Sequence, residues 1–352
     1  MTLLDYLTEA AHSGASDLFL VTGAPVSVKV EGVLRPLEEE RIVPSRGEAL
    51  VKELYTLAQR SSTTFMQTGD DDFSFSVAGL ARFRVNTYRQ RGSVAAVIRV
   101  VAFSIPDYRT LNIPSEVISL ADYTSGMVLV TGTAGCGKST TLACLVDRIN
   151  QQRACHIITL EDPIEYLHRH DMSIVNQREI GLDSQSYANA LRAALREDPD
   201  VILVGEMRDF DTISVAITAA ETGHLVLSTL HTIGAASTVD RVIDVFPPHQ
   251  QQQIRIQFAN ILEAVISQQL IPTADGKSRV AAFEVMHANH AVRNLIREGK
   301  SHQLPSVMQT NRKIGMITMD EAILQLYFEG RISKDMAIQF ATDPDGMAQK
   351  LQ

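Results

Sequence analysis

The sequence predicts an α/β protein in which a small α+β domain precedes a domain built on a parallel sheet. Two observations carry this prediction. Before about residue 110, short segments of alternating polarity stand between helical stretches, as in an antiparallel sheet. After it, continuous apolar runs are each followed by a helical stretch, as in a parallel sheet covered on both faces. The length of 352 residues leaves room for two or three domains.

The first domain is predicted to hold two helical stretches and five strands. Leu3, Leu7 and Ala10 recur at helical spacing, and Gly79 and Gly92 mark breaks between later strands. The domain by itself offers no catalytic constellation. The expected helices are residues 2–12 and 44–66, and the expected strands are 17–21, 26–30, 72–77, 81–88 and 93–101.

The second domain begins after a break in the pattern. Residues 101–125, which include Pro106 and Pro114, are predicted to form a linker with one short helix. An open parallel sheet binds its ligands at the carboxyl ends of the strands, so the residues after each apolar run are the candidates for function. The expected strands are residues 127–130, 157–160, 201–204 and 225–228.

Composition excludes several classes of protein. The formal net charge of −9 argues against a mainly electrostatic nucleic-acid binder. Three cysteines cannot build a disulfide framework, which favours a reducing compartment. The first residues lack the basic and apolar segments of a secretory signal, and no apolar stretch reaches the ~20 residues of a membrane helix. We therefore expect a cytoplasmic protein.

The strongest motif is Gly-Thr-Ala-Gly-Cys-Gly-Lys-Ser at 132–139, which matches the phosphate-binding loop G-x-x-x-x-G-K-S/T between a strand and a helical stretch. Its glycines let backbone N–H groups surround a phosphate at the start of a helix. Lys138 is expected to reach the β- and γ-phosphates of ATP, and the Ser139 hydroxyl to ligate Mg²⁺. The expected nucleotide-binding residues are Gly132, Thr133, Ala134, Gly135, Cys136, Gly137, Lys138, Ser139 and Thr140.

Two acidic segments lie at strand ends that would share an edge with this loop. Glu206 follows the apolar run 201–204, and we predict that it is the general base that orients or deprotonates the attacking water. Glu161, Asp162 and Glu165 follow the run 157–160, and they could hold the metal ion through coordinated waters. The alternative for these three is a charged turn that caps the next helix.

Histidine and arginine side chains complete the candidate site. His224 and His231 bracket the fourth apolar run, and His231 is expected near the γ-phosphate, where a neutral imidazole can donate a hydrogen bond. Neither histidine has a ligand spacing that fits zinc. Arg82 and Arg84 are two residues apart, so they fall on the same face of the strand 81–88. They are either surface charges or a source of positive charge for the phosphates.

These elements together resemble one family. The phosphate-binding loop, the acidic segment 160–165, the segment 205–209 and the histidine-bracketed strand occur in the order found in PilT-type retraction ATPases of the secretion and pilus motor superfamily. Residues 291–298, Ala-Val-Arg-Asn-Leu-Ile-Arg-Glu, nearly repeat the retraction motif of that family. The resemblance covers about residues 1–330.

The resemblance implies an architecture and an activity. It implies a PAS-like domain over residues 1–105, a hinge at 106–125, a RecA-like ATPase domain at 126–285 and a helical region at 286–352. It further implies a homohexamer that hydrolyses ATP with Mg²⁺ to retract a type IV pilus. Arg84 and Arg99 match family arginines that reach nucleotide phosphates, which makes them catalytic candidates with Glu206, Lys138 and His231.

The same resemblance implies partners and a location. The ring would act at the inner face of the cytoplasmic membrane on a platform protein of the pilus, with a paralogous retraction ATPase as a further candidate partner. Neither nucleic acid nor structural zinc is expected.

Some positions depart from the family. Thr133 stands where the loop usually has proline, Cys136 where it has serine, and Phe19 where a histidine is common. The segments 268–277 and 308–352 lean toward PilU-type accessory paralogues. The choice between a principal and an accessory retraction ATPase therefore stays open.

Other classes stay open as weaker alternatives. A secretion or pilus-assembly ATPase of the same superfamily would carry a longer N-terminal region and a tetracysteine zinc module, whereas Cys136, Cys144 and Cys155 lie in or near the phosphate-binding loop. A nucleic-acid motor would need a basic track. A third alternative is a ring subunit that does not hydrolyse ATP. The chain retains Lys138, Ser139 and Glu206, the groups that hydrolysis needs, which argues against it.

Overall fold

The computed structural model describes residues 1–30, 32–101 and 105–352. Residue 31, and residues 102–104 of the predicted segment 101–125, lie outside the described residues. The chain divides into two units, which we describe separately. The N-terminal unit comprises residues 1–104 and 165–167, and the C-terminal unit comprises residues 105–164 and 168–352.

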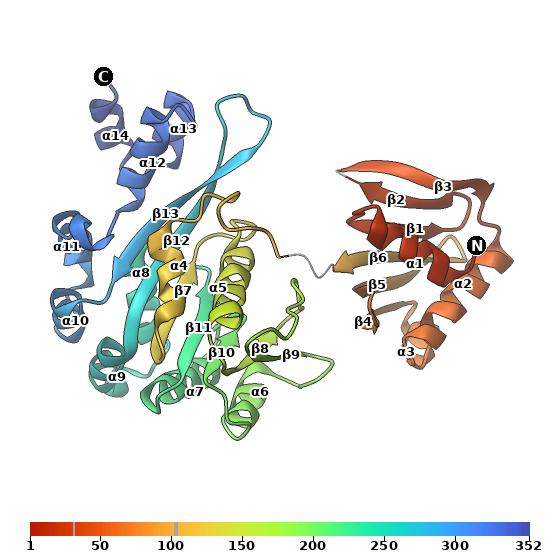
Figure 1. The fold of residues 1–352 in the computed structure, drawn as a ribbon, viewed down its shortest axis with the longest axis horizontal. Helices are drawn as coiled ribbons and strands as arrows, with labels where there is room; N and C mark the ends of the chain where they lie inside the picture. Colours follow the sequence, from red (N-terminus) through yellow and green to blue (C-terminus); the bar gives the residue numbers. More distant parts are fainter. Residues whose placement is uncertain (31, 102–104) are drawn as a thin grey trace. The chain divides into compact units, whose positions relative to one another are not determined.

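The N-terminal unit is an antiparallel sheet with the strand order β3-β2-β1-β6-β5-β4 (Figure 1). β3 was not predicted, because this edge strand is mostly exposed and its charged sequence shows no apolar alternation. The single predicted helix 44–66 is two helices with a break after Leu57. The elements are α1 (Leu3–His12), β1 (Asp17–Val21), β2 (Pro25–Val30), β3 (Val33–Arg41), α2 (Pro44–Leu57), α3 (Thr63–Thr68), β4 (Asp70–Val77), β5 (Ala81–Gln90) and β6 (Ser93–Val101).

The helices of this unit pack against the sheet through one apolar cluster. α1 begins with a capping box in which Thr2 and Asp5 exchange hydrogen bonds, and its apolar side buries Leu3, Tyr6 and Leu7. Phe83 of β5 is fully buried in the same cluster. The core therefore joins residues from the first helix to the last strand of the unit.

The C-terminal unit contains a seven-stranded sheet with the order β13-β12-β7-β11-β10-β8-β9. Every pair is parallel except β12 with β13. The four predicted runs are β7, β8, β10 and β11, and they lie side by side as expected. The strands are β7 (Gly126–Thr131), β8 (His156–Glu161), β9 (Ile174–Glu179), β10 (Val201–Val204), β11 (Leu225–Leu230), β12 (Leu262–Pro272) and β13 (Arg279–His287).

Helices cover both faces of this sheet, which explains its apolar strands. Val128 and Val130 of β7 pack with α4 and α5, which lie in front of the sheet in Figure 1, whereas Met127 and Leu129 pack with α6 to α11. The helices are α4 (Ser115–Ile118), α5 (Lys138–Gln152), α6 (Tyr187–Ala194), α7 (Phe210–Glu221), α8 (Ala235–Asp244), α9 (Pro248–Ile261), α10 (His290–Arg297), α11 (Leu304–Thr310), α12 (Met319–Phe328), α13 (Lys334–Phe340) and α14 (Pro344–Lys350).

The segment predicted as a linker belongs in large part to the core of the C-terminal unit. Ile113, Val117 and Leu120 are buried in the cluster that contains α5. Apolar side chains at these three positions anchor the segment, so it is ordered by packing after Ile105. Its role as a hinge remains a prediction.

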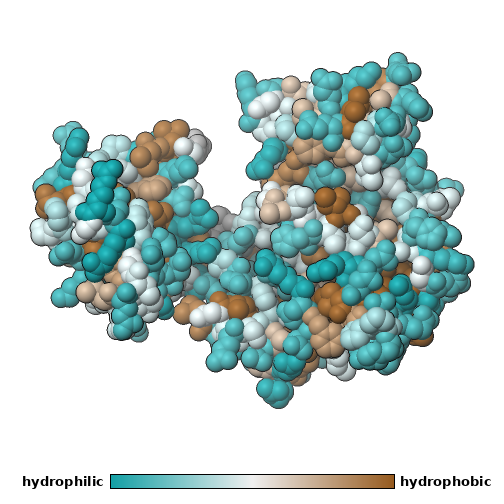
Figure 2. All heavy atoms as spheres, turned by 180° about the vertical axis from the view of Figure 1, so that it is seen from behind, coloured by the Kyte–Doolittle hydropathy of each residue, from teal (hydrophilic) through white to brown (hydrophobic). Residues whose placement is uncertain are grey.

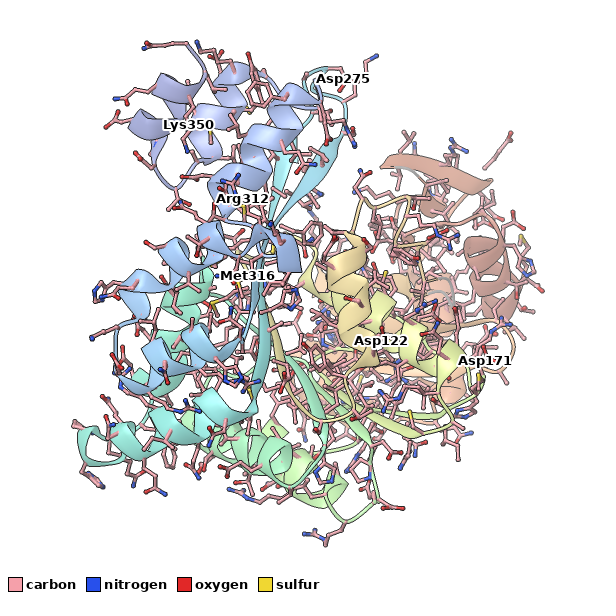
Figure 3. The ribbon with its side chains drawn as sticks, turned by 60° about the vertical axis from the view of Figure 1, so that its left-hand side comes forward. Asp122, Asp171, Asp275, Arg312, Met316 and Lys350 are labelled. Carbon is pink, nitrogen blue, oxygen red and sulfur yellow. The ribbon has the colours of Figure 1, made fainter. Side chains whose placement is uncertain are left out.

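The last three helices pack apart from the main core. α12, α13 and α14 form a separate cluster with the far ends of β12 and β13, including Ile271 and Val280. Figure 3 shows Asp275 at the tip of the β12–β13 turn and Lys350 on the last helix. Figure 2 shows mainly hydrophilic residues on the face that it displays, with apolar residues in small separate groups.

We predict that Phe83→Ala destabilises the N-terminal unit by about 3–5 kcal/mol, because it removes a fully buried ring and leaves a cavity. Hydrogen exchange of the β4–β6 amides in the full chain measures this change. Phe328→Ala is the matched control, since that ring is 72% exposed. Equal exchange in both variants would contradict the packing described here.

Candidate functional site

The carboxyl ends of four neighbouring strands bring the predicted motifs to one edge of the sheet. The phosphate-binding loop follows β7, and His231 follows β11. Glu206 comes two residues after β10, and Glu161 ends β8. The structure therefore gathers motifs that are up to 99 residues apart, from Gly132 to His231, at the edge where parallel sheets bind ligands.

The phosphate-binding loop is shaped by glycines and closed by its lysine. Gly132 has a φ of 138° and Gly137 a φ of 96°, and α5 begins directly after Gly137. Lys138 is 8% exposed, and its Nζ donates to the backbone carbonyls of Gly132 at 2.9 Å and Thr133 at 3.0 Å. The ammonium thus lies inside the loop, where the β- and γ-phosphates of a nucleotide would bind.

Two further loop residues differ in their exposure. Ser139 is exposed in the first turn of α5, so its hydroxyl is accessible to a metal ion. Cys136 is 2% exposed, and burial raises the pKa of its thiol while the charge of Lys138 lowers it. Burial is the larger effect, so the pKa of the Cys136 thiol lies above its ordinary value, which favours the neutral form.

Gln268 on β12 supports the loop, and the sequence reading missed it. Its Oε1 accepts a hydrogen bond from Thr141 Oγ1 at 2.8 Å. A Cβ at Gly132 would lie 2.3 Å from the Gln268 carbonyl oxygen, and one at Gly137 would lie 2.8 Å from its Nε2. This contact could not be foreseen because β12, which pairs with β7, was not predicted.

Glu206 and His231 meet at the centre of the site. One Glu206 oxygen, Oε2, lies 3.3 Å from His231 Nε2 and 2.7 Å from Arg208 Nε. The Glu206 side chain is 19% exposed, whereas that of Arg208 is 71% exposed. Sequence reasoning assigned no role to Arg208, although its position two residues after Glu206 in a loop was a usable signal.

The hydroxyl of Tyr187 on α6 lies beside Gly205, the residue before Glu206. Burial raises the pKa of this hydroxyl, and the charges of Glu206, Asp162 and Glu161 raise it further. A Cβ at Gly205 would lie 2.9 Å from the tyrosine oxygen and 3.1 Å from the Leu160 carbonyl. Glycine at 205 therefore lets the chain turn closely enough to present Glu206.

The three acidic residues Glu161, Asp162 and Glu165 do not all lie together at the sheet edge. Glu161 accepts hydrogen bonds from Thr159 Oγ1 at 2.6 Å and from Gln177 Nε2 at 3.1 Å. Asp162 is exposed and precedes a cis proline, whereas Glu165 groups with the N-terminal unit. Across residues 1–30, 32–101 and 105–352, no three His, Cys, Asp or Glu side chains converge as a metal site.

The two histidines of the bracketed strand lie at opposite ends of β11. His224 precedes the strand, and its Nδ1 is 2.9 Å from the Ala219 carbonyl at the end of α7. It therefore lies away from Glu206. Only His231 is placed at the carboxyl edge of the sheet.

Arg84 and Arg99 lie directly opposite each other on neighbouring strands of the N-terminal unit. They are Cα partners on β5 and β6, and Arg84 is exposed. The Arg99 side chain is 64% exposed, with its Nε 3.1 Å from Asp17 Oδ1. The two guanidinium groups thus share one sheet face. Their role toward a nucleotide remains a prediction.

Residues 291–297 lie in α10, and Glu298 directly follows the helix as its C-cap. The apolar side of α10 is part of the main core. Val292 and Ile296 are fully buried against the sheet-covering helices. Arg293 pairs with Glu263 at 3.1 Å and donates to the carbonyls of Ala259 and Asn260. Core packing accounts for the amphipathic pattern, and the retraction role stays an implication of the resemblance.

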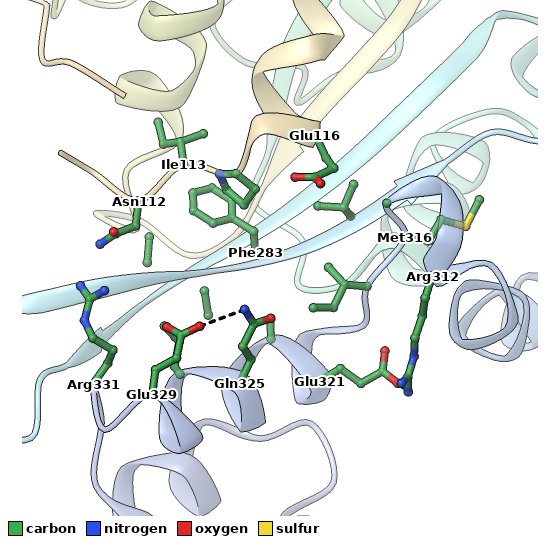
Figure 4. Close-up of a pocket in the computed structure, with 18 residues that line it drawn as sticks. Asn112, Ile113, Glu116, Phe283, Arg312, Met316, Glu321, Gln325, Glu329 and Arg331 are labelled. Atoms are coloured by element: carbon green, nitrogen blue, oxygen red, sulfur yellow. Dashed lines mark hydrogen bonds and ion pairs between the residues drawn. The ribbon is translucent and has the colours of Figure 1, made fainter. Parts of the chain in front are cut away.

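A cavity of about 650 Å³ lies elsewhere in the C-terminal unit (Figure 4). Residues of β13 line it, with Ile113 and Glu116 on one side. Gln325 of α12 and Glu329, which directly follows that helix, line the other side. None of the predicted site residues lines it. The nucleotide site is therefore defined by the sheet edge and its motifs.

The fold and the loop define the C-terminal unit as a P-loop nucleotide-binding domain. The chain belongs to the type II/IV secretion system protein family, which matches residues 2–339.

Relatives and a solved structure refine this assignment. The chain is 44% identical over 345 residues to the type IV pilus retraction ATPase PilT of Pseudomonas aeruginosa, covering 98% of this chain and 99% of that protein. It is 46% identical over 321 residues to a twitching motility protein of Neisseria gonorrhoeae, covering 91% and 85%. A crystal structure of the pilus retraction motor PilT with bound ADP matches with a TM-score of 0.88 and 46% identity over 98% of both chains.

These findings confirm the predicted fold class and the resemblance to PilT-type retraction ATPases. The PilU ATPase of Pseudomonas aeruginosa is also similar, at 39% identity over 330 residues, covering 94% of this chain and 86% of that protein. Within the part of the chain that the structure describes, every helix is too short or too polar to cross a membrane.

We predict that Gly132→Ala abolishes nucleotide binding, because the added Cβ would lie 2.3 Å from the Gln268 carbonyl and force the loop to shift. Titration with a fluorescent ADP analogue measures the affinity. Gly276→Ala is the matched control, since Gly276 also has positive φ but has open space around it. Retained affinity in Gly132→Ala would contradict the role assigned to the loop geometry.

Proposed function

We propose that this protein is an ATPase motor that hydrolyses ATP to power the retraction of a type IV pilus. The observation that carries the proposal is the meeting of Glu206 and His231, 3.3 Å apart, at the sheet edge that also presents Lys138. A carboxylate, an imidazole and a phosphate-binding loop at one edge are the groups that ATP hydrolysis needs. The names of the relatives support the coupling of this activity to pilus retraction.

Each group has a role that follows from its position. Lys138 exchanges the loop carbonyls for the β- and γ-phosphates when ATP binds, and the backbone N–H groups of the loop surround the phosphates. Glu206 orients the attacking water and accepts its proton. His231, beside Glu206, donates a hydrogen bond to the γ-phosphate and is positioned to sense its loss.

The residues present fit Mg²⁺, a hard cation that prefers oxygen ligands. The exposed Ser139 hydroxyl would ligate it, with the carboxylates of Glu161 and Asp162 holding its waters. When bound, the ion neutralises charge on the phosphates during transfer. Like Glu161 and Asp162, Glu165 is proposed to contact the ion through a bound water.

The proposal extends to assembly and location. A homohexamer would place Arg84 and Arg99 of the N-terminal unit at a nucleotide and convert hydrolysis into movement between units. The ring would act on a platform protein of the pilus from the cytoplasmic side of the inner membrane. Deletion in the host tests this function: excess pili without twitching support retraction, and loss of pili supports assembly.

An accessory, PilU-like role is the second candidate, favoured by the 39% identity to that ATPase. The same deletion distinguishes it, because an accessory motor leaves some retraction to the principal one. Loss of all retraction would support the principal role.

We expect Glu206→Gln to lower ATP turnover by on the order of 10²–10⁴-fold and to leave ATP binding intact, because the amide cannot accept the proton of water. Steady-state phosphate release and nucleotide titration measure the two effects. Glu221→Gln, an exposed position at the end of α7, is the control. Wild-type turnover in Glu206→Gln would overturn the general-base assignment.

Arg84→Ala and Arg99→Ala should each lower kcat on the order of 10³-fold, with a smaller loss of nucleotide affinity, if they stabilise transferred phosphate. Arg35→Ala on the exposed edge strand β3 serves as control.

Mixing two inactive variants tests whether Arg84 acts at the nucleotide site of a neighbouring copy. After subunit exchange has been verified with tagged copies, a mixture of Arg84→Ala and Glu206→Gln proteins should regain ATPase activity. A site can then combine an intact arginine with an intact glutamate from different copies. No recovery would count against an interface role.

A further inference from the structure

A partly buried carboxylate outside the proposed mechanism joins two helices of the C-terminal unit. Glu284 lies on β13, and its Oε1 accepts a hydrogen bond from the Ala235 backbone N–H at 2.6 Å. Its Oε2 accepts one from the Met319 backbone N–H at 3.1 Å. Ala235 begins α8 and Met319 begins α12, so a single side chain caps both helices.

Glu284 stands in the same cross-strand row as the residues that precede the nucleotide motifs. The phosphate-binding loop and His231 directly follow two members of this row. A third member, Ser267, accepts a hydrogen bond from the Gly234 backbone N–H at 3.0 Å. The segment from His231 to Ala235 is thus held at two points of the row. The row consists of Leu230, Thr131, Ser267 and Glu284.

The same residue marks the boundary between two apolar cores. Met286 packs in the main core with α8, whereas Ala282 packs in the separate cluster of α12 to α14. Burial raises the pKa of Glu284. The hydrogen bonds from the two backbone N–H groups lower it, but the effect of burial is larger. Since a carboxylate at such a position is costly without hydrogen-bond donors, both helix N-termini are needed to hold it.

We infer that Glu284 is a positioning residue that couples the segment after His231 to α12 and the helices that follow it. A change at His231 on nucleotide binding alters the start of α8, and the shared carboxylate passes this change to the start of α12. The inference rests on the proposed function, because it takes nucleotide to bind beside His231. It adds a route from that site to the C-terminal helices.

Hydrogen exchange in the full chain, with and without ADP, tests the coupling. In the wild type, ADP should change amide exchange both at residues 231–238 and at 318–323. Glu284→Gln should keep the first change and lose the second. Glutamine keeps the size of the side chain but has one acceptor oxygen, so it cannot accept from both helices.

A matched variant separates coupling from simple fraying of α12. Glu321 caps the same helix, since its Oε2 accepts from the Thr318 N–H at 3.3 Å, but no described contact joins it to α8. Glu321→Gln should therefore retain the ADP response of residues 318–323. Loss of that response in both variants would overturn the inference.

Kinetics give a second readout. Glu284→Gln should lower kcat for ATP by on the order of 2- to 30-fold with an unchanged KM, because coupling, not binding, is lost. If Glu284→Gln melts well below the wild type, Ala235→Pro is the alternative variant. It removes the Ala235 N–H that donates to Glu284, and it does so at the first position of α8, where proline is tolerated. Wild-type kcat and exchange in these variants would overturn the proposal.

The outcomes also separate this inference from the proposed function. Wild-type protein that fails to bind ADP would contradict the proposed function. Wild-type protein that binds ADP, but whose residues 318–323 exchange as in the free protein, would overturn the coupling alone.

Discussion

The site depends on the pairing of β7 with β11 on one side and β12 on the other. This register aligns Thr131, the last residue before the phosphate-binding loop, with Leu230 and Ser267. His231, which directly follows β11, and Gln268, the next residue of β12, are thereby placed on the two flanks of the loop. Because parallel strands end at a common edge, one register decides the position of the loop, its supporting glutamine and its histidine together.

Polar side chains around that edge are held by fixed hydrogen-bond or ion-pair partners, some in their own loop and some on other elements. Lys138 is bonded to the loop it belongs to, and Glu206 is bonded by Arg208 and His231. Glu284 extends the pattern along the same row to the edge strand β13, where it accepts hydrogen bonds from the first residues of two helices. A carboxylate with fixed donors has few alternative positions, so movement of one donor is transmitted to the other.

Much of the fold follows from local pattern. Continuous apolar runs at β7, β8, β10 and β11 predicted a parallel sheet, and its position under helices on both faces agrees with that pattern. β3 escaped prediction because a solvated edge strand needs no apolar alternation. β12 was not predicted, nor was its partner β13, because β12 begins at Leu262 directly after α9 ends at Ile261, so no turn residue separates the helix from the strand.

The sequence alone determined the class of site. The loop at 132–139, Glu206 and His231 carry their chemistry in residue type and in their place after apolar runs, and both properties are local. Tertiary structure decided the contacts that join distant segments: Gln268 on the loop, Arg208 beside His231 at one carboxylate, and Glu284 between α8 and α12. These contacts depend on strand order and register across the sheet, which arise from packing of the whole unit and leave no periodic mark in the sequence.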